Sequence, residues 1–227
     1  MSHTETPITM NRIITNFNKL YPAFAAKLVS GSDVVIFEHE NIGKPNTFQK
    51  LTVKNVTGWN FSRDFLENTK SFHSKAQNGV TADLECHDIM TRECDGLFCR
   101  EEGDDIVFHF FELKSSFEVD NLSKAKNQIV GSYLKMLHLL APLQHFGSKN
   151  ITMQGHIIIY EPTPEKLSTF KDLTDHKSRF CLRIHNDKRC HMPADKCSRF
   201  WHPLTCPDIS LDLTELPFGT ISHQITL

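Results

Sequence analysis

The chain has 227 residues, 39% of them hydrophobic and 23% charged, with 25 Lys and Arg against 27 Asp and Glu for a formal net charge of −2. This composition excludes intrinsic disorder, collagen and coiled coil, and the length is enough to bury one sizeable core. No apolar run is as long as a membrane span, and residues 1–29 lack the features of a secretory signal. The seven cysteines are an odd set that argues against a closed disulfide framework, so we expect a cytoplasmic protein with free thiols.

Residues 1–59 are expected to form an N-terminal extension of one helix and two strands. Apolar side chains at helical spacing predict a helix over residues 11–29, and Pro22 predicts a break in it near Tyr21. β-Branched and aromatic residues predict strands over residues 33–37 and 48–56. We expect this extension to take no part in the chemistry, although its helix would be suited to dimerisation.

Residues 60–160 are expected to form the core of the protein. Their spacing of apolar and turn-forming residues predicts the order helix, three antiparallel strands, helix, strand. The last strand is apolar throughout, as a strand buried on both faces would be, and Asp120 is a suitable N-cap for the second helix. The expected positions are residues 60–77 for the first helix, 82–90, 93–100 and 106–114 for the three strands, 120–142 for the second helix and 151–160 for the last strand.

Residues 161–227 are expected to be a basic, Cys- and His-rich extension that packs on the same domain. A helix is predicted over residues 164–173 and a strand over residues 180–184, followed by a region without clear periodicity. Side chains able to bind a structural Zn²⁺ ion recur there, but at spacings of no standard zinc motif, so buried cysteines and surface histidines are the preferred interpretation. These side chains are Cys190, His191, Cys197, His202 and Cys206, with Cys181 upstream.

Three charged side chains are predicted to meet on one face of the meander. Successive side chains of a strand alternate between faces, which places Glu112 and Lys114 on the same side. A hairpin that turns about Glu102-Gly103 would put Asp95 opposite Phe110, one diagonal step from Glu112. Two neighbouring carboxylates repel each other, and a hard cation such as Mg²⁺ or Mn²⁺ relieves that repulsion.

Asp95-Gly96 followed by Glu112-Leu113-Lys114, within this order of elements, resembles the PD-(D/E)xK nuclease superfamily with its restriction-endonuclease-like αβββαβ core. The resemblance implies that Asp95 and Glu112 bind the metal through their carboxylates. It also implies that Leu113 binds the metal through its carbonyl and that Lys114 orients the attacking water. Cys94 stands where the family name has proline.

Members of this superfamily also carry polar residues on the helix after the third strand and an acid on the first core helix. Gln128 is the residue that we align with the first feature, as a further catalytic residue. It belongs to a polar stripe at helical spacing, made of Lys124, Gln128, Ser132 and Lys135. For the additional acid the candidates are Glu67 and Asp64, and the spacing does not select between them.

The near-neutral net charge conceals two stretches of opposite charge. Residues 83–120 contain twelve acidic and three basic residues, which suits them to attract cations. Residues 166–202 contain nine basic and four acidic residues, and such a stretch is able to follow a phosphate backbone. Trp201 beside Arg199 offers an aromatic face to a base, and the alternative is a solvated basic loop with a core tryptophan.

The sequence therefore predicts a Mg²⁺-dependent nuclease, endonuclease or exonuclease, that hydrolyses phosphodiester bonds in nucleic acid. DNA is favoured over RNA because the resemblance leans that way, and a restriction or phage-defence role follows by analogy alone. We expect no membrane partner, and a homodimer or a larger protein complex is open. The alternative is a non-catalytic nucleic-acid-binding or scaffold module that keeps the nuclease-like fold.

Overall fold

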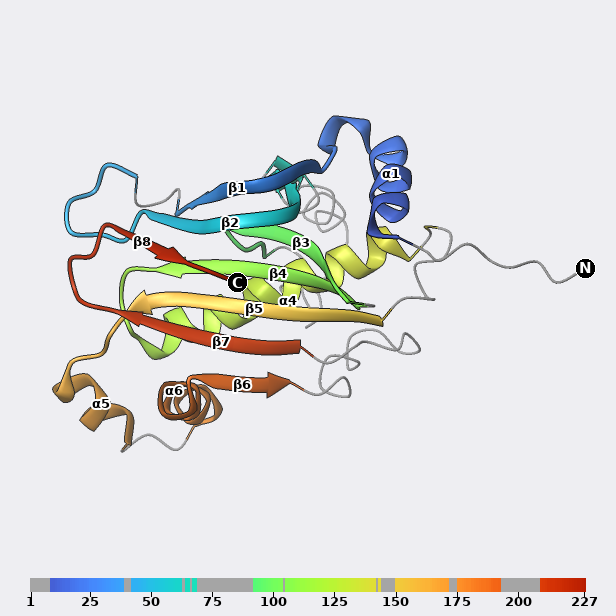
Figure 1. Ribbon diagram of the computed structural model, residues 1–227. Helices are drawn as coiled ribbons and strands as arrows, with labels where there is room; N and C mark the ends of the chain where they lie inside the picture. Colours follow the sequence, from blue (N-terminus) through green and yellow to red (C-terminus); the bar gives the residue numbers. More distant parts are fainter. Residues whose placement is uncertain are drawn as a thin grey trace, which may run out of the picture.

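The computed structural model describes residues 9–38, 42–62, 64–65, 67–68, 92–103, 105–141, 143, 150–171, 175–192 and 209–227. These residues form one eight-stranded mixed sheet and four α-helices (Figure 1). The strand order is β1-β2-β3-β4-β5-β7-β6, and β8 pairs with β2 beside this path. The predicted mixed α/β class, with a sheet of both parallel and antiparallel strands, is therefore confirmed.

The helices are α1 (Met10–Leu20), α4 (Val119–Leu140), α5 (Pro164–Lys171) and α6 (His176–Asp187), with a short 3₁₀ helix, η1 (Pro22–Phe24). The strands are β1 (Lys27–Phe37), β2 (Lys50–Phe61), β3 (Gly96–Glu102), β4 (Asp105–Lys114), β5 (Asn150–Tyr160), β6 (Arg189–Met192), β7 (Ile209–Leu216) and β8 (Ser222–Ile225). Strands from all three segments expected from the sequence thus enter a single sheet.

Helix α1 confirms the break predicted near Tyr21. It ends at Leu20, and Pro22 then begins η1. The prediction that the helix resumes after the break is wrong, because β1 starts at Lys27. The apolar face of α1 packs into the core of its own chain, so this face is not available to a second copy; its buried residues are Met10, Ile13, Ile14 and Phe17.

Strands β2, β3 and β4 form an antiparallel meander, and α4 then leads to β5, which runs parallel to β4. The pairing of β2 with β3 covers only Trp59–Phe61. The predicted start of the first core helix at Asn60 is wrong, because that residue still belongs to β2. The predicted strand 82–90 lies outside the described residues, so β2 is the strand that precedes β3 in the sheet.

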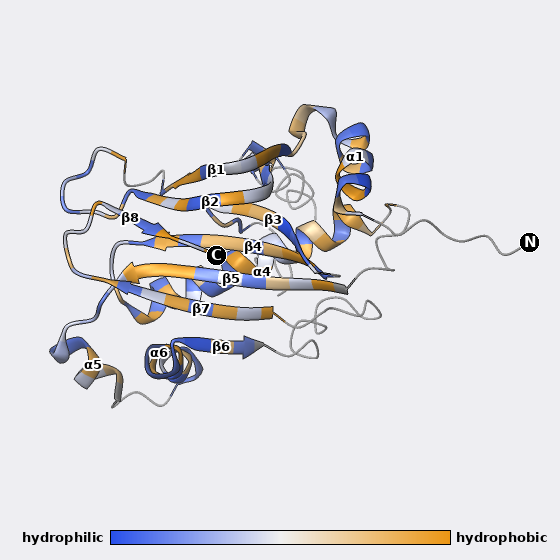
Figure 2. Ribbon diagram, in the orientation of Figure 1, coloured by the Kyte–Doolittle hydropathy of each residue, from blue (hydrophilic) through white to orange (hydrophobic). Residues whose placement is uncertain are grey.

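Two apolar clusters lie on opposite sides of the central strands. Phe108 and Phe110 of β4 belong to the cluster that includes α1, α4 and α6, whereas Phe111 and Leu113 belong to the cluster that includes β1 and β2. The alternation predicted for β4 is therefore confirmed. The carboxyl-terminal part of β5, coloured orange in Figure 2, is buried along its whole run of isoleucines, as expected for a central parallel strand.

The C-terminal third departs most from expectation. Residues 180–184, predicted as a strand, lie within α6, whose N-cap Asp175 accepts hydrogen bonds from the backbone N–H groups of Lys177 and Ser178. Strands β6, β7 and β8 occupy the region that showed no clear periodicity. Among the described residues, no helix is long and apolar enough to cross a membrane.

Candidate active site

Asp95 lies just before β3 and Glu112 near the end of β4, where the pairing of the two strands ends. Gly96 pairs with Phe111 and Glu102 with Asp105, a register two residues from the predicted one. The hairpin turn lies one residue later in the chain than expected and includes Gly103, which adopts a left-handed φ of 62°. Because the shift in register is even, the paired side chains of β3 and β4 keep the faces that were predicted, and the charge of Asp95 acts on Glu112.

Backbone hydrogen bonds fix Asp95 at this position. Its N–H donates to the carbonyl of Phe111 at 2.9 Å, and its Oδ2 accepts from the N–H of Leu113 at 2.8 Å. The N–H and C=O groups of a strand residue point to the same side, so the Leu113 carbonyl is directed to the same edge of β4 as Asp95. The two carboxylates and the carbonyl expected from the sequence are thus brought to one place.

Glu112 is a fully buried carboxylate, with 0% of its surface exposed. Its Oε1 forms an ion pair with the ammonium group of Lys114, and no described residue hydrogen-bonds to its Oε2. Burial and the negative charges of Asp95 and Glu38 raise the pKa of Glu112 well above its usual value, against the opposing effect of Lys114. A carboxylate in this environment gains strongly from a cation.

Lys114 is the positive partner of this carboxylate, and 12% of its side chain is exposed. Burial lowers the pKa of the ammonium group, but the carboxylates of Glu112, Asp95 and Glu38 outweigh it, so the pKa is raised. The amine therefore stays protonated at neutral pH, as a donor and a positive charge rather than as a base.

The polar stripe of α4 faces the segment that carries Asp95. The side-chain amide of Gln128 donates to the carbonyl of Glu93 at 2.9 Å, and the N–H of Cys94 donates to Oγ of Ser132 at 2.8 Å. The buried ammonium group of Lys135 lies 3.9 Å from Oε2 of Glu93. Gln128 thus holds the backbone two residues before Asp95, while no described residue hydrogen-bonds to its buried Oε1.

Glu38, just after β1, is the site residue that the sequence did not single out. It is 6% exposed and lines a pocket at the end of β4, and its charge acts on both Glu112 and Lys114. The N-terminal extension thus places a carboxylate beside the predicted site residues, which the sequence did not indicate. An acid directly after an alternating strand was the available signal, but only the tertiary fold places that strand end beside β4.

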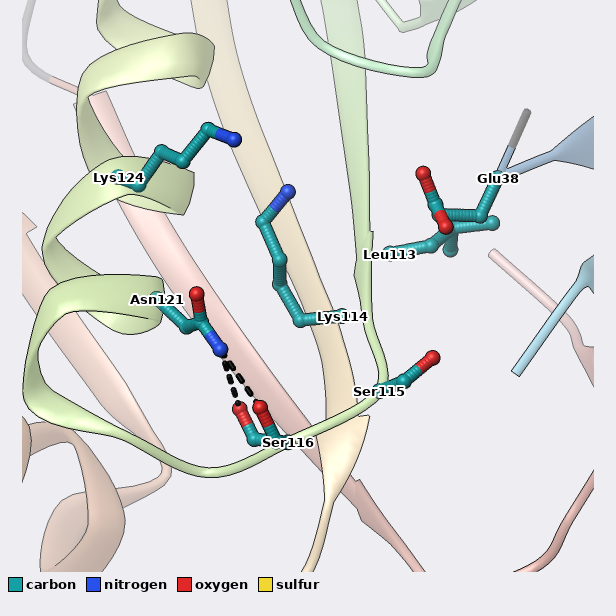
Figure 3. A pocket seen from close by; sticks show the side chains of 7 residues that line it. All are labelled: Glu38, Leu113, Lys114, Ser115, Ser116, Asn121 and Lys124. Carbon is teal, nitrogen blue, oxygen red and sulfur yellow. Dashed lines mark hydrogen bonds between the residues drawn. The ribbon is translucent and has the colours of Figure 1, made fainter. Parts of the chain in front are cut away.

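The pocket has a volume of about 190 Å³ and lies between the end of β4 and the first turns of α4 (Figure 3). Figure 3 shows Lys114 and Lys124 on one side of β4, and Glu38 on the other side. Its lining residues are Glu38, Leu113, Lys114, Ser115, Ser116, Asn121 and Lys124. The pocket thus opens directly beside two members of the predicted tripeptide.

The two acids suggested for the first core helix do not enter this constellation. Asp64 and Glu67 are both exposed, and neither contributes to the pKa shifts of Glu112 or Lys114. Among the described residues, Glu38 is the additional acid whose charge reaches the site.

The carboxylates near Lys114 are suited to few kinds of metal ion. No group of three or more His, Cys, Asp and Glu side chains in the described parts of the chain is placed to hold one. Mg²⁺ needs fewer protein ligands, because it binds through one or two carboxylates and keeps several waters. The buried Oε2 of Glu112, next to the charge of Asp95, fits such an ion.

The described cysteines are free, buried thiols rather than exposed nucleophiles. Burial raises the pKa of Cys94 and of Cys181 to about 12, so both remain protonated. Of the six residues considered for a zinc site, Cys181, Cys190 and His191 lie in the described chain; the zinc hypothesis stays a prediction.

Much of the basic C-terminal stretch is paired with acids of the same chain. Lys166 and Lys177 pair with Glu118 and Asp120 at the start of α4, and three further pairs are Arg183 with Asp187, Lys188 with Glu215 and Arg189 with Asp212. Arg199 and Trp201 lie outside the described residues. The described part of this stretch therefore offers little unpaired positive charge to a phosphate backbone.

No family model matches the chain, and neither a curated protein nor a solved structure is similar to it. The site must therefore be judged on its own chemistry.

Proposed function

We propose that this protein is a metal-dependent nuclease of the PD-(D/E)xK type that hydrolyses phosphodiester bonds, with DNA as the favoured substrate. The observation that carries the proposal is the buried carboxylate of Glu112, which feels the charge of Asp95 and is paired with Lys114. Burying a carboxylate next to further negative charge costs several kcal/mol unless positive charge is added, and Lys114 supplies only one. An arrangement this costly is typical of a ligand site.

Asp95, Glu112 and the Leu113 carbonyl would hold Mg²⁺ or Mn²⁺. The ion would supply Lewis acidity and lower the pKa of a bound water. Lys114 donates hydrogen bonds, so it orients the water and offsets the negative charge that develops on the phosphate. In the hydrolysis, a water oxygen would bond to phosphorus as the bond from phosphorus to the leaving oxygen breaks; the water would release a proton to solvent, and the leaving oxygen would take one from solvent.

Gln128, Ser132 and Lys135 support this site indirectly. Their contacts with Glu93 and Cys94 hold the backbone that leads into Asp95. A metal site loses affinity when the groups that orient its ligands are removed, typically by 10–100-fold. We therefore assign positioning roles to these side chains.

The order of the elements supports the same proposal. Three consecutive antiparallel strands, a helix and a parallel strand, as in β2, β3, β4, α4 and β5, correspond to the βββαβ part of the restriction-endonuclease-like core. Asp95 would lie at the start of its second strand and Glu112 in its third. The helix that precedes these strands in that core would correspond to α1.

A cleavage assay tests the proposal. Wild-type protein with Mg²⁺ or Mn²⁺ is expected to cut or degrade at least one of a panel of single- and double-stranded DNA and RNA substrates. Glu112→Gln and Lys114→Met should lower the rate by about 10²–10³-fold or more, because each removes a charge that acts on the transition state. The matched controls are Asp33→Asn and Lys54→Met, which change exposed residues that pair with each other away from the site.

Cleavage that is undiminished in both site variants would contradict the assignment of these residues. Binding of nucleic acid without cleavage of any substrate would instead favour the non-catalytic module with a nuclease-like fold. A circular dichroism spectrum and a melting curve for each variant separate loss of chemistry from loss of structure.

A further inference from the structure

Exposed apolar side chains gather where two loops meet, at the end of the sheet at which β4, β5 and β7 finish. Ile42, in the loop between β1 and β2, is 55% exposed. Phe218 and Ile221, between β7 and β8, are 75% and 53% exposed, and these three residues form the apolar rim. The backbone N–H of Gln49 donates to the carbonyl of Ile221 at 3.0 Å, so the two loops lie side by side (Figure 1). Single apolar residues are common on protein surfaces, but a group of them from two segments is typical of a contact surface.

Two contacts connect the apolar rim to the candidate site. Tyr160 ends β5 one residue beyond the partner of Lys114, and its ring packs against that of Phe218 with centroids 5.4 Å apart. In the other loop, the backbone N–H of Phe48 donates to Oγ of Ser115 at 3.0 Å, and Ser115 lines the pocket. The apolar rim therefore borders the pocket beside the candidate metal ligands.

The loop between β1 and β2 adds positive charge to the same surface. Residues 42–50 contain Lys44 and Lys50, and neither this segment nor residues 217–227 contain an acidic residue. Both lysines are exposed, and neither forms an ion pair with a carboxylate of the described chain. The surface is thus apolar and aromatic at one loop and basic at the other, which suits a partner with apolar faces and negative charge.

Single-stranded nucleic acid has this combination of properties. Because 75% of the surface of Phe218 is exposed, its ring has an open face. Bases of a single strand stack on such a ring, and lysines attract the phosphates between the bases. In a duplex each base is already stacked on its neighbours, so its face is not available without extrusion.

We propose that the apolar rim and the two lysines bind a single-stranded segment of the substrate, with one base stacked on Phe218 near the scissile phosphate. The inference rests on the proposed nuclease function and narrows its substrate to single-stranded nucleic acid, or to a duplex with an unpaired segment. Ile42 and Ile221 extend the apolar surface around that base, while Lys44 and Lys50 hold the backbone. Stacking does not read base edges, so this contact selects single strands and not a sequence.

Binding measured in EDTA tests this contact separately from cleavage. Phe218→Ala should weaken binding of a fluorescently labelled single-stranded oligonucleotide at least about fivefold, whereas Phe218→Trp should bind as the wild type does. Leu28→Ala, which changes a 66% exposed residue near the start of β1, is the control and should have no effect. A melting curve for each variant confirms that it is folded.

Two further measurements separate stacking from charge. An oligonucleotide that contains 2-aminopurine should lose fluorescence when it is saturated with the wild type, because stacking quenches this base, and should keep more of it with Phe218→Ala. Lys44→Gln and Lys50→Gln should each reduce the slope of log K against log salt by about 0.7. Lys54→Gln removes an equal charge from a side chain that pairs with Asp33, and it should leave the slope unchanged.

Normal single-strand binding by Phe218→Ala, or equal affinity of the wild type for a blunt duplex and a single strand, would overturn this inference and leave a protein that cuts as a nuclease. Phe218-dependent binding in a protein that cuts no substrate would reject the nuclease and keep this surface as part of a binding module. A wild type that binds no nucleic acid, and forms an oligomer that Phe218→Ala dissociates, would overturn the inference and assign the apolar rim to a protein contact.

Discussion

The two faces of β4 bury ionisable side chains in opposite ways. On the face toward α4, Glu112 is buried beside Asp95 and its pKa is raised. On the other face, His109 is equally buried but bonds to His156 of β5, with 3.0 Å between Nδ1 of the first ring and Nε2 of the second. Burial lowers the pKa of His109 to about 2 and that of His156 to about 4, so both rings are neutral at physiological pH.

The histidine pair responds to burial by losing its charge, although Nε2 of His109 has no hydrogen-bond partner among the described residues. One neutral ring donates to the other, and His156 also stacks on Phe111 with ring centroids 4.8 Å apart. The carboxylate pair has no equivalent solution, because two acids that lose their charge give up the ion pair with Lys114, and two that keep it repel. Burial of titratable groups is therefore not by itself a sign of function: the carboxylates still require a cation, whereas the histidines are neutral and require no added charge.

The largest expected difference between the two faces is the response to metal. Mg²⁺ at about 100 times its Kd should raise the free energy of unfolding by about 2.7 kcal/mol. Glu112→Gln and Asp95→Asn should abolish this gain, and His156→Gln should leave it intact. Because the metal competes with a proton on Glu112, whose pKa is raised, the stabilisation should grow as the pH rises through that pKa. Urea titrations with and without Mg²⁺ at several pH values measure the effect.

Equal metal stabilisation in wild type and Glu112→Gln would contradict the assignment of Glu112 as a metal ligand. Asp33→Asn, which changes an exposed carboxylate that pairs with Lys54, is the control for nonspecific effects of charge.

The second prediction concerns the loss of folding stability in acid. The pKa values of both histidines are lower in the folded state than the usual 6.5, so the unfolded chain binds more protons as the pH falls below 6.5. Between pH 7 and pH 5 the pair should therefore cost about 2–4 kcal/mol of stability, and His156→Gln should remove about 2 kcal/mol of that loss. Urea titrations at the two pH values measure this difference, with the exposed His176→Gln as control. An acid sensitivity that is identical in wild type and His156→Gln would contradict the assignment.

The sequence predicted the parts of the site that depend on local periodicity. Alternation along β4 placed Glu112 and Lys114 together, and helical spacing placed Gln128 on the face of α4 that meets the Asp95 segment. The hairpin register was missed by two residues, because it depends on which residues Gly103 allows the turn to use. Glu38 was missed because sequence patterns do not report which strand ends meet in the fold.

Errors in the C-terminal third have a similar origin. The apolar residues of 180–184 predicted a strand. Cys181 and Ile184 are, however, spaced as one face of a helix, and Asp175 is the N-cap of α6. The alternation of Ile209, Leu211 and Leu213, which are buried in β7, was present in the sequence but lies beside a stretch rich in Cys, His and Pro. Short strands at the end of a sheet are defined mainly by the neighbours that they pair with.

The third prediction concerns the hydrogen bond between Ser132 and the backbone of Cys94, next to Asp95. Ser132→Ala removes the acceptor for the buried N–H of Cys94, which should cost about 1–2 kcal/mol of unfolding free energy. Because Cys94 precedes Asp95, the metal stabilisation should also weaken, whereas the acid sensitivity caused by the histidines should not change. Ser178→Ala, which also changes a buried serine but on α6, is the control: it should lose stability without losing the response to metal. Full metal stabilisation in Ser132→Ala would show that Asp95 is held without this bond.

The smallest predicted effect separates a charge near the metal from a ligand of the metal. Glu38 raises the pKa of Glu112 through its charge, as one of several causes and not the largest. Glu38→Gln should therefore shift the pH at which Mg²⁺ stabilises half-maximally to a lower value, by less than about one unit, and leave the maximal gain at high pH close to that of the wild type. A ligand would behave differently, because its removal lowers the gain at every pH. The full pH series of Mg²⁺ stabilisation for Glu38→Gln thus decides between the two roles, and a shift to higher pH would show that Glu38 does not act on Glu112 through its charge.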